Sequence, residues 1–468
     1  MNTEPVFRAV ALRDAPIFRQ DRVEDVLFYT PGYAAIADVR HVDAFQSHLA
    51  ALASDTVGSE RFTSSDHSEI NEPVYIHAAR LYHEAVSVRE RWAAAQMRPF
   101  TPLCLTLYLH TACNLHCTYC FAGSQPLRVD TPRLNLKTIE LAAEAVAEAC
   151  AAQGRPFTVV FHGGGEPTLD QELADDALTI VERMAARCRL AIFRYIATNG
   201  IMSTQKAAWM AARFDLIGLS CDGPAEIQSR QRGENTNRYV ERTARIVNQA
   251  GKPLHVRVTL TPDGLARQAE IAAYLCRQLH PQEIEVEPVY QGGRAGKEDC
   301  FRPEQAEDFV NEFLRARETA RRFGVTWQTS GSRPGEMHGP YCNVFRNVVN
   351  LIPGGAAIAC FKNVDAGQCG AIGQVNDATH TLVLDHDRIA LLRHELSAAE
   401  PECAACFNQY HCARGCPDQC PIEQGGYSVA AGFRCRMQKL LAQALIQEAA
   451  NSLHNDGNGI VTSGALNI

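Results

Sequence analysis

Between about residues 100 and 325, short apolar runs alternate with longer amphipathic segments. Residues 104–112 read CLTLYLHTA, which is typical of a buried strand, and residues 134–154 follow with apolar positions at helical spacing that end at Gly154. Further strands are predicted at 157–164, 190–200, 216–223, 255–262 and 283–290, and further helices at 172–188, 203–214, 237–251, 267–279 and 303–324. Six such strand–helix units predict an α/β fold with a parallel sheet covered by helices, either doubly wound or a partial (β/α)6 barrel.

The two flanking regions have other patterns. Residues 1–99 predict a small α+β module, with a hairpin at 24–38 and helices at 43–52 and 75–96. Beyond about residue 330 the chain is rich in Gly and Cys and has only short apolar runs, the composition of a fold organised by metals. We therefore expect four parts: an N-terminal module at 1–99, a core at 100–328, a Cys-rich domain at 329–450 and a tail at 451–468.

Composition narrows the function classes. The chain of 468 residues is 46% hydrophobic and 21% charged, with a net charge of -8 and no long basic run, so nucleic acid and anionic membranes are poor partners. The first residues lack a signal-peptide pattern and no apolar stretch could span a bilayer, which predicts a cytoplasmic protein. In that reducing compartment, 18 cysteines gathered mainly in two clusters indicate metal binding and argue against a disulfide framework.

Unusual residues follow each predicted strand of the core. Cys113, Cys117 and Cys120 follow the first strand, GGGEPT follows the second, TNG the third and SCDG the fourth, while Arg257 lies in the fifth. The carboxyl ends of parallel strands meet at one rim, so these residues are expected to share an active site.

The spacing C-x3-C-x2-C places three thiolates on one short loop. A [4Fe–4S] cluster takes four ligands, so three thiolates leave one iron open to chelate a small molecule. The alternative is zinc, with Cys104 as the fourth ligand. Cys104 begins the first strand about nine residues upstream, roughly 30 Å of extended chain, and is more simply a core residue.

These motifs together resemble the radical S-adenosylmethionine (SAM) superfamily. The loop HTACNLHCTYCFAG, the GGGEP that matches the superfamily's GGE motif, and TNG and SCDG occur in the order of its rim motifs, over about residues 100–325. The resemblance implies that Cys113, Cys117 and Cys120 hold the SAM-binding cluster. It also implies that the remaining contacts come from eight rim residues: Tyr119, Phe121, Gly164, Gly165, Glu166, Asn199, Ser220 and Arg257. Reductive cleavage of SAM then yields a 5′-deoxyadenosyl radical that abstracts a hydrogen atom.

The second cysteine cluster resembles the SPASM extension of radical SAM enzymes, which binds two auxiliary [4Fe–4S] clusters. The resemblance assigns Cys342, Cys360 and Cys416 to auxiliary cluster I, and Cys403, Cys406, Cys412 and Cys435 to auxiliary cluster II. The chain would then hold three four-iron clusters. Zinc at the C-x2-C pair is the alternative.

Auxiliary cluster I lacks the extra cysteine that some family members carry just before the first SPASM cysteine. Its fourth ligand could come from Cys369, Cys420, His338 or Glu336. Otherwise one iron stays open, and an open iron could bind a substrate thiolate and so favour thioether chemistry.

The resemblance implies a maturase that installs an intramolecular thioether or carbon–carbon cross-link in a ribosomally made peptide or protein. The hairpin at 24–38 could add a leader peptide as an extra strand, or could be packing scaffold. The alternatives are a sulfatase-maturating type of oxidase that forms formylglycine, and a non-catalytic iron–sulfur electron carrier. A radical SAM enzyme also implies a reducing partner such as flavodoxin or ferredoxin.

Overall fold

The computed structural model describes residues 7–12, 15–54, 72–340, 342–360, 370–376, 378–397, 401–414, 432–453 and 461–466. Within these, a large sheet has the strand order β11-β10-β9-β8-β7-β6-β5-β12-β13-β14-β15. Its six central strands are β5 (Cys104–Leu107), β6 (Phe157–Phe161), β7 (Ile192–Thr198), β8 (Leu216–Ser220), β9 (Leu254–Leu260) and β10 (Glu283–Pro288). They pair in parallel and in chain order, which confirms the six predicted strands.

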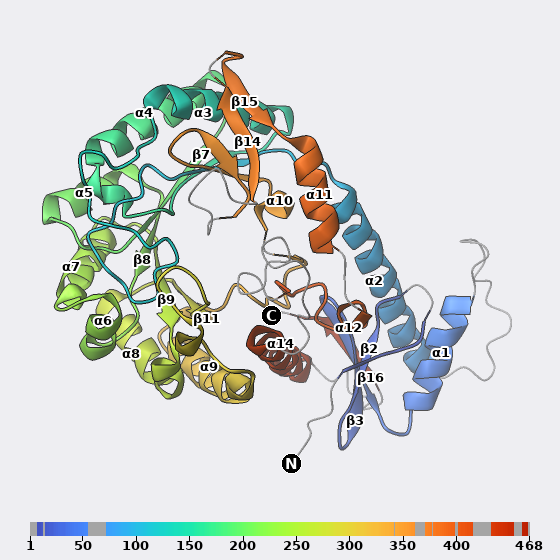
Figure 1. Cartoon of the computed structure of the whole chain (residues 1–468). Coiled ribbons are helices and arrows are strands. Elements are labelled where there is room, and N and C mark those ends of the chain that lie inside the picture. Colours follow the sequence, from blue (N-terminus) through green and yellow to red (C-terminus); the bar gives the residue numbers. More distant parts are fainter. Residues whose placement is uncertain are drawn as a thin grey trace.

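The chain order of these strands decides between the two predicted architectures. A doubly wound sheet reverses its strand order near the middle, whereas this sheet runs from β5 to β10 without a reversal. The connecting helices therefore lie on one side, as an arc outside the strands (Figure 1). They are α3 (Leu136–Ala152), α4 (Gln171–Arg187), α5 (Thr204–Arg213), α6 (Ala225–Arg232), α7 (Thr236–Gln249), α8 (Gln268–Leu279) and α9 (Ala306–Arg321). The fold is a partial (β/α)6 barrel, and α6 is the one helix here that the sequence pattern did not predict.

Local signals explain where these helices begin and end. Ser203 is the N-cap of α5, and its side chain accepts a hydrogen bond from the Lys206 backbone N–H at 3.2 Å. Asn135 caps α3 in the same way through the Thr138 N–H. Gly154 follows α3 with a φ of 59°, the left-handed conformation that stops a helix without steric cost.

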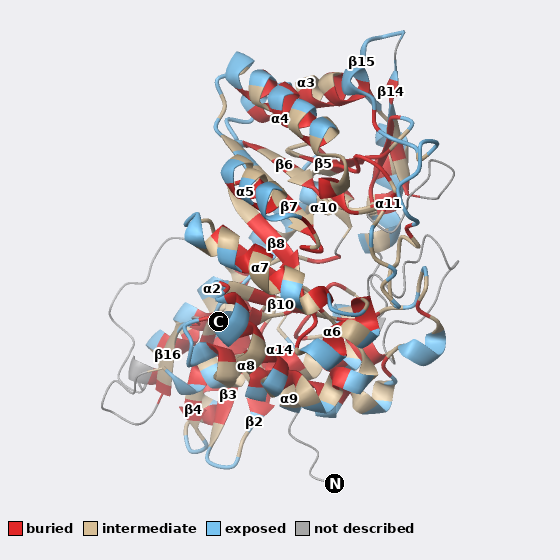
Figure 2. Ribbon diagram, turned by 90° about the vertical axis from the view of Figure 1, so that its left-hand side faces the viewer, coloured by how far each residue is buried: buried red, intermediate tan, exposed pale blue. Residues whose placement is uncertain are grey.

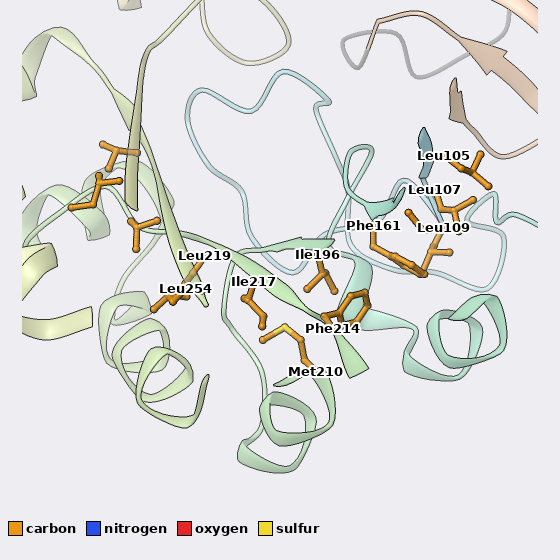
Figure 3. Close-up of a cluster of buried hydrophobic side chains, with 14 of the residues drawn as sticks. Leu105, Leu107, Leu109, Phe161, Ile196, Met210, Phe214, Ile217, Leu219 and Leu254 are labelled. Carbon is orange, nitrogen blue, oxygen red and sulfur yellow. The ribbon is translucent and has the colours of Figure 1, made fainter. Parts of the chain in front are cut away.

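The core fills the space between the strands and the helix arc. Figure 2 shows the buried inner faces of the helices, and Figure 3 shows Phe161, Phe214 and Met210 packed beside the strand residues Ile196 and Ile217. Along β9 the side chains alternate between fully buried and partly buried. Apolar residues therefore face the helices, and partly accessible residues, many of them polar, face the barrel interior.

The C-terminal region extends the same sheet. Strand β12 (Val348–Leu351) pairs in parallel with β5, and β13 (Ala356–Ile358), β14 (Ala371–Asn376) and β15 (Thr381–Leu384) continue antiparallel from it. At the other end β11 (Thr326–Gln328) pairs with β10. The helices of this region within the described residues are α10 (Asn343–Arg346), α11 (His386–Ser397), α12 (Pro401–Ala404) and α14 (Phe433–Asn451).

The N-terminal module is a second, antiparallel sheet backed by two helices. Strands β3 (Asp25–Thr30) and β4 (Tyr33–Asp38) form the predicted hairpin, and α1 (Val42–Ser54) and α2 (Glu72–Met97) occupy the predicted helical segments. Strands β1 (Arg8–Ala9) and β2 (Phe18–Asp21) complete one end. The other end is β16 (Val461–Ala465), from the last residues of the chain, which pairs with β4 over five positions. Within the described residues, no helix is both long and apolar enough to cross a membrane.

Candidate active site at the barrel rim

The three-cysteine loop lies between β5 and α3, at the carboxyl ends of the parallel strands. Two tight turns shape it, with the Cys120 N–H donating to the Cys117 carbonyl at 3.2 Å and the Gly123 N–H donating to the Cys120 carbonyl at 3.3 Å. The three thiols are partly exposed and close enough to interact electrostatically. Burial raises the pKa of Cys113 to about 12, with smaller contributions from Glu166 and the other two thiols. A cationic iron–sulfur centre would reverse this effect and hold the thiolates.

The GGGEP segment packs directly against this loop. The Glu166 N–H donates to the Ala112 carbonyl at 2.8 Å. A Cβ atom at Gly165 would stand 1.9 Å from that same carbonyl oxygen, so only glycine allows the two segments to approach. Gly164 has a φ of 71°, the left-handed region that favours glycine. The glycines predicted from the motif are therefore required by backbone contact.

Glu166 is a buried carboxylate with hydrogen bonds on both oxygens. Its Oε1 accepts from the Thr168 hydroxyl at 2.7 Å and the Thr198 hydroxyl at 2.8 Å, and its Oε2 accepts from the Asn199 N–H at 2.7 Å. Burial raises the pKa of Glu166, and these donors oppose that rise. Since Oε2 takes a single bond among the described residues, it can accept a further donor such as an ammonium group.

Asn199 joins Glu166 to the three-cysteine loop. Its side-chain Nδ2 lies 2.8 Å from Asn114 Oδ1 and 3.6 Å from Cys113 Sγ, while its backbone binds Glu166. Asn114 in turn donates to the Ile201 carbonyl at 2.9 Å. The structure thus brings together the TNG, GGGEP and cysteine motifs, as the sequence predicted for one rim.

The Tyr119 hydroxyl forms a hydrogen bond with a buried ion pair. It donates to Asp222 Oδ2 at 2.5 Å, and Asp222 also accepts from Arg232 Nε at 2.8 Å. The Arg232 guanidinium lies 5.4 Å from the centre of the Tyr119 ring. This ion pair anchors one side of the cysteine loop. A hydrogen bond from the Thr118 N–H to the Gln231 carbonyl holds the same side.

A second anchor comes from the segment after β10. The Arg294 N–H donates to the Cys120 carbonyl at 3.0 Å, and its guanidinium donates to the carbonyls of Cys117 and Ser124. Gly293 has a φ of 59°, and a Cβ there would stand 2.1 Å from the Cys120 carbonyl oxygen. Phe121 stacks on Tyr290 of the same segment, with ring centres 6.3 Å apart.

Ser220 and Arg257 lie deeper in the barrel. They are register neighbours on β8 and β9, and within the described residues neither forms a hydrogen bond with the cysteine loop. Arg257 Nη2 lies 3.5 Å from Glu285 Oε1, and this carboxylate raises the pKa of Arg257. His162, which is half-buried directly after β6, has its pKa lowered to about 3, first by burial and then by Arg257. The barrel interior is therefore polar and closely charge-balanced.

Four of the C-terminal cysteines converge in space. Burial raises the pKa of Cys412 to about 12, and the thiols of Cys403, Cys406 and Cys435 add to the rise, so all four lie near one another. Cys412 Sγ is 2.7 Å from Gln438 Oε1, and the Arg414 N–H donates to the same sulfur at 3.2 Å. These four are the residues that the resemblance groups as auxiliary cluster II.

The other proposed set is described in part. Cys342 caps α10, and the Asn343 N–H donates to the carbonyl of Ala359, the neighbour of Cys360, at 3.4 Å. Cys360 in turn adds to the pKa rise of buried Tyr108 on the barrel rim. Cys416, Cys369 and Cys420 lie outside the described residues. His338 Nδ1 donates to the Gly339 carbonyl at 3.0 Å, and His411 Nδ1 donates to the Glu336 backbone carbonyl at 2.6 Å.

The donor set at the rim fits a four-iron cluster with SAM. Three neighbouring thiols occupy one loop, and the buried Glu166 carboxylate, with a lone pair available on Oε2, lies beside that loop. The two segments approach closely at Gly165, where a Cβ atom would collide with the loop backbone. Within the described residues, no three His, Cys, Asp or Glu side chains are placed to ligate one metal ion. A four-iron cluster takes one thiolate at each of several irons and so spaces its ligands more widely than a single zinc ion does.

Sequence reasoning missed the two anchors of the cysteine loop. Asp222 belongs to the quoted SCDG motif, but its partner Arg232 lies on α6, which showed no apolar stripe. Gly293 and Arg294 lie in QGGRAG, where the paired glycines after the sixth strand were an available signal for a close backbone approach.

Comparison with known proteins agrees with this geometry. Residues 107–274 match the family model described as the Radical SAM superfamily. A sulfatase-maturating enzyme of the cysteine type from Clostridium perfringens is 30% identical over 141 residues, 29% of this chain and 38% of that protein. An uncharacterised protein of Methanothermobacter thermautotrophicus is 28% identical over 178 residues, 36% of this chain and 63% of that protein. The matches thus span less than two thirds of these relatives.

Solved structures share the fold over a larger part of the chain. The anSMEcpe structure with bound AdoMet superposes with a TM-score of 0.59 at 20% identity, covering 75% of this chain and 98% of that one. Streptococcus suis SuiB bound to its precursor peptide SuiA superposes with a TM-score of 0.52 at 14% identity, covering 89% and 98%. The chain is thus similar to the Radical SAM superfamily over residues 107–274 and shares the fold of these two solved structures.

Proposed function

We propose that this radical SAM protein is a peptide maturase that installs an intramolecular cross-link, a thioether or a carbon–carbon bond, in a ribosomally made peptide or protein. The observation that carries the proposal is the pairing of an incomplete three-thiol site at the barrel rim with a second, four-thiol site. When bound, the clusters and SAM would supply a 5′-deoxyadenosyl radical for hydrogen abstraction and an acceptor for the electron that cross-linking releases.

The chain's own residues would bind and orient SAM. Cys113, Cys117 and Cys120 would hold the cluster, and Glu166 Oε2 would accept a hydrogen bond from the SAM ammonium group. Asn199 would fix the position of Glu166 relative to the loop, since its backbone and side chain contact both. The buried Asp222–Arg232 pair would keep the loop closed against water.

The remaining expected SAM contacts have more limited roles. Gly164 and Gly165 would admit the SAM methionine moiety close to the backbone. Phe121, stacked on Tyr290, would border the site, whereas the Tyr119 hydroxyl is occupied by Asp222. Ser220 and Arg257 would face the ribose, the carboxylate or the substrate from the barrel interior.

The C-terminal cysteines would hold the two auxiliary clusters. Cys403, Cys406, Cys412 and Cys435 would ligate one cluster, and Cys342, Cys360 and Cys416 the other. An open iron in the second would favour thioether formation through a substrate thiolate. Zinc is a poorer candidate, because the radical chemistry of the rim requires an electron acceptor and zinc has no redox chemistry.

A leader peptide would add as a strand to the N-terminal sheet. The hairpin edge at β4 is taken by β16, so among the described strands the outer edges of the sheet are β1, with two residues, and β16, with five. The longer edge offers more main-chain hydrogen bonds, and we assign the peptide to β16. The SuiB structure was solved with its precursor peptide, which supports a peptide substrate for this fold.

A sulfatase-type oxidation to formylglycine is the second candidate. Its support is the 30% identity to the Clostridium perfringens enzyme and the TM-score of 0.59 to anSMEcpe. A non-catalytic electron carrier is the third candidate function. An electron carrier does not require a three-thiol site next to a carboxylate that can accept a further hydrogen bond, so this candidate is the weakest.

Mass spectrometry distinguishes these functions. The iron-loaded protein is incubated anaerobically with SAM, a reductant and the short peptides encoded beside its gene, with Cys113→Ala as the matched inactive control. A cross-link appears as the loss of two hydrogen atoms with no aldehyde and with fragment ions missing between the joined residues. An aldehyde that reacts with a hydrazine reagent supports formylglycine formation instead, and no 5′-deoxyadenosine from the intact protein contradicts both enzymes.

A further inference from the structure

One stripe of α7 carries unneutralised positive charge next to the three-cysteine loop. Arg238, Arg242 and Arg245 are spaced i, i+4 and i+7, so they share one face of the helix. Arg238 and Arg245 are exposed and Arg242 is half-buried. Within the described chain, no carboxylate forms an ion pair with any of the three.

The arginines of the outer helices α4 and α9 differ in this respect. Arg183 and Arg187 of α4 pair with Glu140 and Glu144 of α3, and the arginines of α9 pair with glutamates of their own helix or of α14. On α7, Glu241 accepts a hydrogen bond from the Tyr274 hydroxyl at 2.7 Å, on the side facing α8. Glu234 is exposed before the helix begins. The stripe is therefore a local positive patch on a chain whose net charge is -8.

The patch has a rigid geometry. Two guanidinium groups stack on the Tyr239 ring, with that of Arg238 5.0 Å and that of Arg242 4.9 Å from the ring centre. Arg242 also donates to the Met202 carbonyl. Cation–π stacking fixes these long side chains and reduces the entropy that a partner would have to remove on binding.

The patch borders the exposed side of the cysteine loop. Arg242 binds the Met202 carbonyl and Asn114 of the loop binds the neighbouring Ile201 carbonyl at 2.9 Å. Exposed and half-buried residues alternate along the loop, and the exposed ones are Asn114, His116 and Thr118. The loop is thus the part of the rim site nearest to solvent on this side, and α7 lies beside it.

We propose that the exposed loop residues together with Arg238, Arg242 and Arg245 form the docking surface for an acidic one-electron carrier protein. This inference rests on the proposed function, which requires an electron at the three-thiol site. In the step the carrier loses one electron and the cluster gains it, with no bond made and no proton moved. A chain with net negative charge repels an acidic protein over most of its surface, so a local positive patch selects the approach that leads to the cluster.

The test compares a protein reductant with a small one. The reduction of the iron-loaded protein is followed anaerobically by the bleaching of the cluster absorbance, using either a reduced bacterial flavodoxin or dithionite. The variant Arg238→Glu with Arg245→Glu reverses two exposed charges. The matched control is Arg155→Glu with Arg189→Glu, two exposed arginines before β6 and β7, at the opposite end of the strands, with the same change in net charge.

We expect the α7 variant to be reduced by flavodoxin about 10-fold more slowly than wild type at low salt, with the difference shrinking in high salt. We expect dithionite to reduce both variants at the wild-type rate. Flavodoxin should reduce the control variant at the wild-type rate as well. Equal flavodoxin rates for all three proteins, or an equal loss in the control, overturn the proposal. So does a higher KM for a peptide substrate with unchanged flavodoxin rates. A wild-type protein that dithionite cannot reduce contradicts the proposed function instead.

Discussion

The two cysteine sites are supported in different ways. The rim loop is attached to six parallel strands with a large apolar core, and its backbone is fixed by Arg294 on one side and the Asp222–Arg232 pair on the other. The C-terminal set lies on a four-residue helix, a turn and α14. Its apolar neighbours Phe407 and Tyr410 pack against the N-terminal sheet. We therefore expect the first site to keep its shape without a bound cluster, and the second to depend on a cluster and on its contacts with the N-terminal sheet.

The largest expected effect comes from removing a thiolate at the rim. In Cys113→Ala we expect no detectable 5′-deoxyadenosine, while the urea midpoint of the barrel changes little because the loop is held by carbonyl contacts. Iron per chain would fall by about four from the roughly twelve of three four-iron clusters. Chromatography of the products, urea titration and iron analysis provide the three readouts.

Cys188→Ala is the matched control, because Cys188 lies at the end of α4 and is expected to keep wild-type turnover. If Cys113→Ala still accumulates 5′-deoxyadenosine, the assignment of the rim site is wrong.

The reverse pattern is expected at the C-terminal set. Cys412→Ala leaves a buried cysteine set one ligand short, so α14 and residues 401–414 should lose stability by several kcal/mol, on the order of a structural metal site's contribution. Hydrogen exchange would show fast amides there and protected amides in β5–β10. Fast exchange spreading through the barrel strands would contradict the separation of the two sites.

The smallest expected effect concerns acid sensitivity of the barrel interior. The pKa of His162 is about 3 in the folded protein and near 6.5 in an unfolded chain, so the unfolded chain binds more protons between these values. The stability that the neutral ring confers is complete above pH 6.5 and is lost as pH falls toward 3. In His162→Gln the unfolding free energy should therefore fall by about 2 kcal/mol less than in wild type between pH 7 and pH 5.

Urea unfolding at the two pH values measures this difference. His394→Gln removes an exposed imidazole and is expected to behave as wild type. If His162→Gln shows the wild-type loss of stability, the ring is not the source of the acid sensitivity.

The sequence predicted the barrel and its rim well, because strand–helix alternation and short motifs are local signals. Each predicted strand of the core has its counterpart among β5–β10, and the motifs around Cys113, Glu166 and Asn199 do meet. The first strand, predicted to reach residue 112, ends at Leu107 because the chain turns toward the cysteine loop.

Contacts between distant segments left no comparable signal. The strand β16 reads VTSGA, without an alternating apolar pattern, and the 451–468 segment was expected to be a tail. The pairing of β12 with β5 and the reach of Arg294 to the cysteine loop also depend on tertiary packing. Local sequence propensity does not predict such contacts, because neither of the two contacting segments has a distinctive sequence pattern of its own.

The pairing of β16 with β4 has a consequence for biosynthesis. The hairpin of the N-terminal sheet leaves the ribosome early, yet its edge at β4 gains its partner only when residues 461–465 have been made. Throughout synthesis of the barrel that edge stays open to other strands, including those of neighbouring nascent chains. Completion of this sheet therefore waits for the synthesis of β16, and it couples two segments that lie more than 400 residues apart in the sequence.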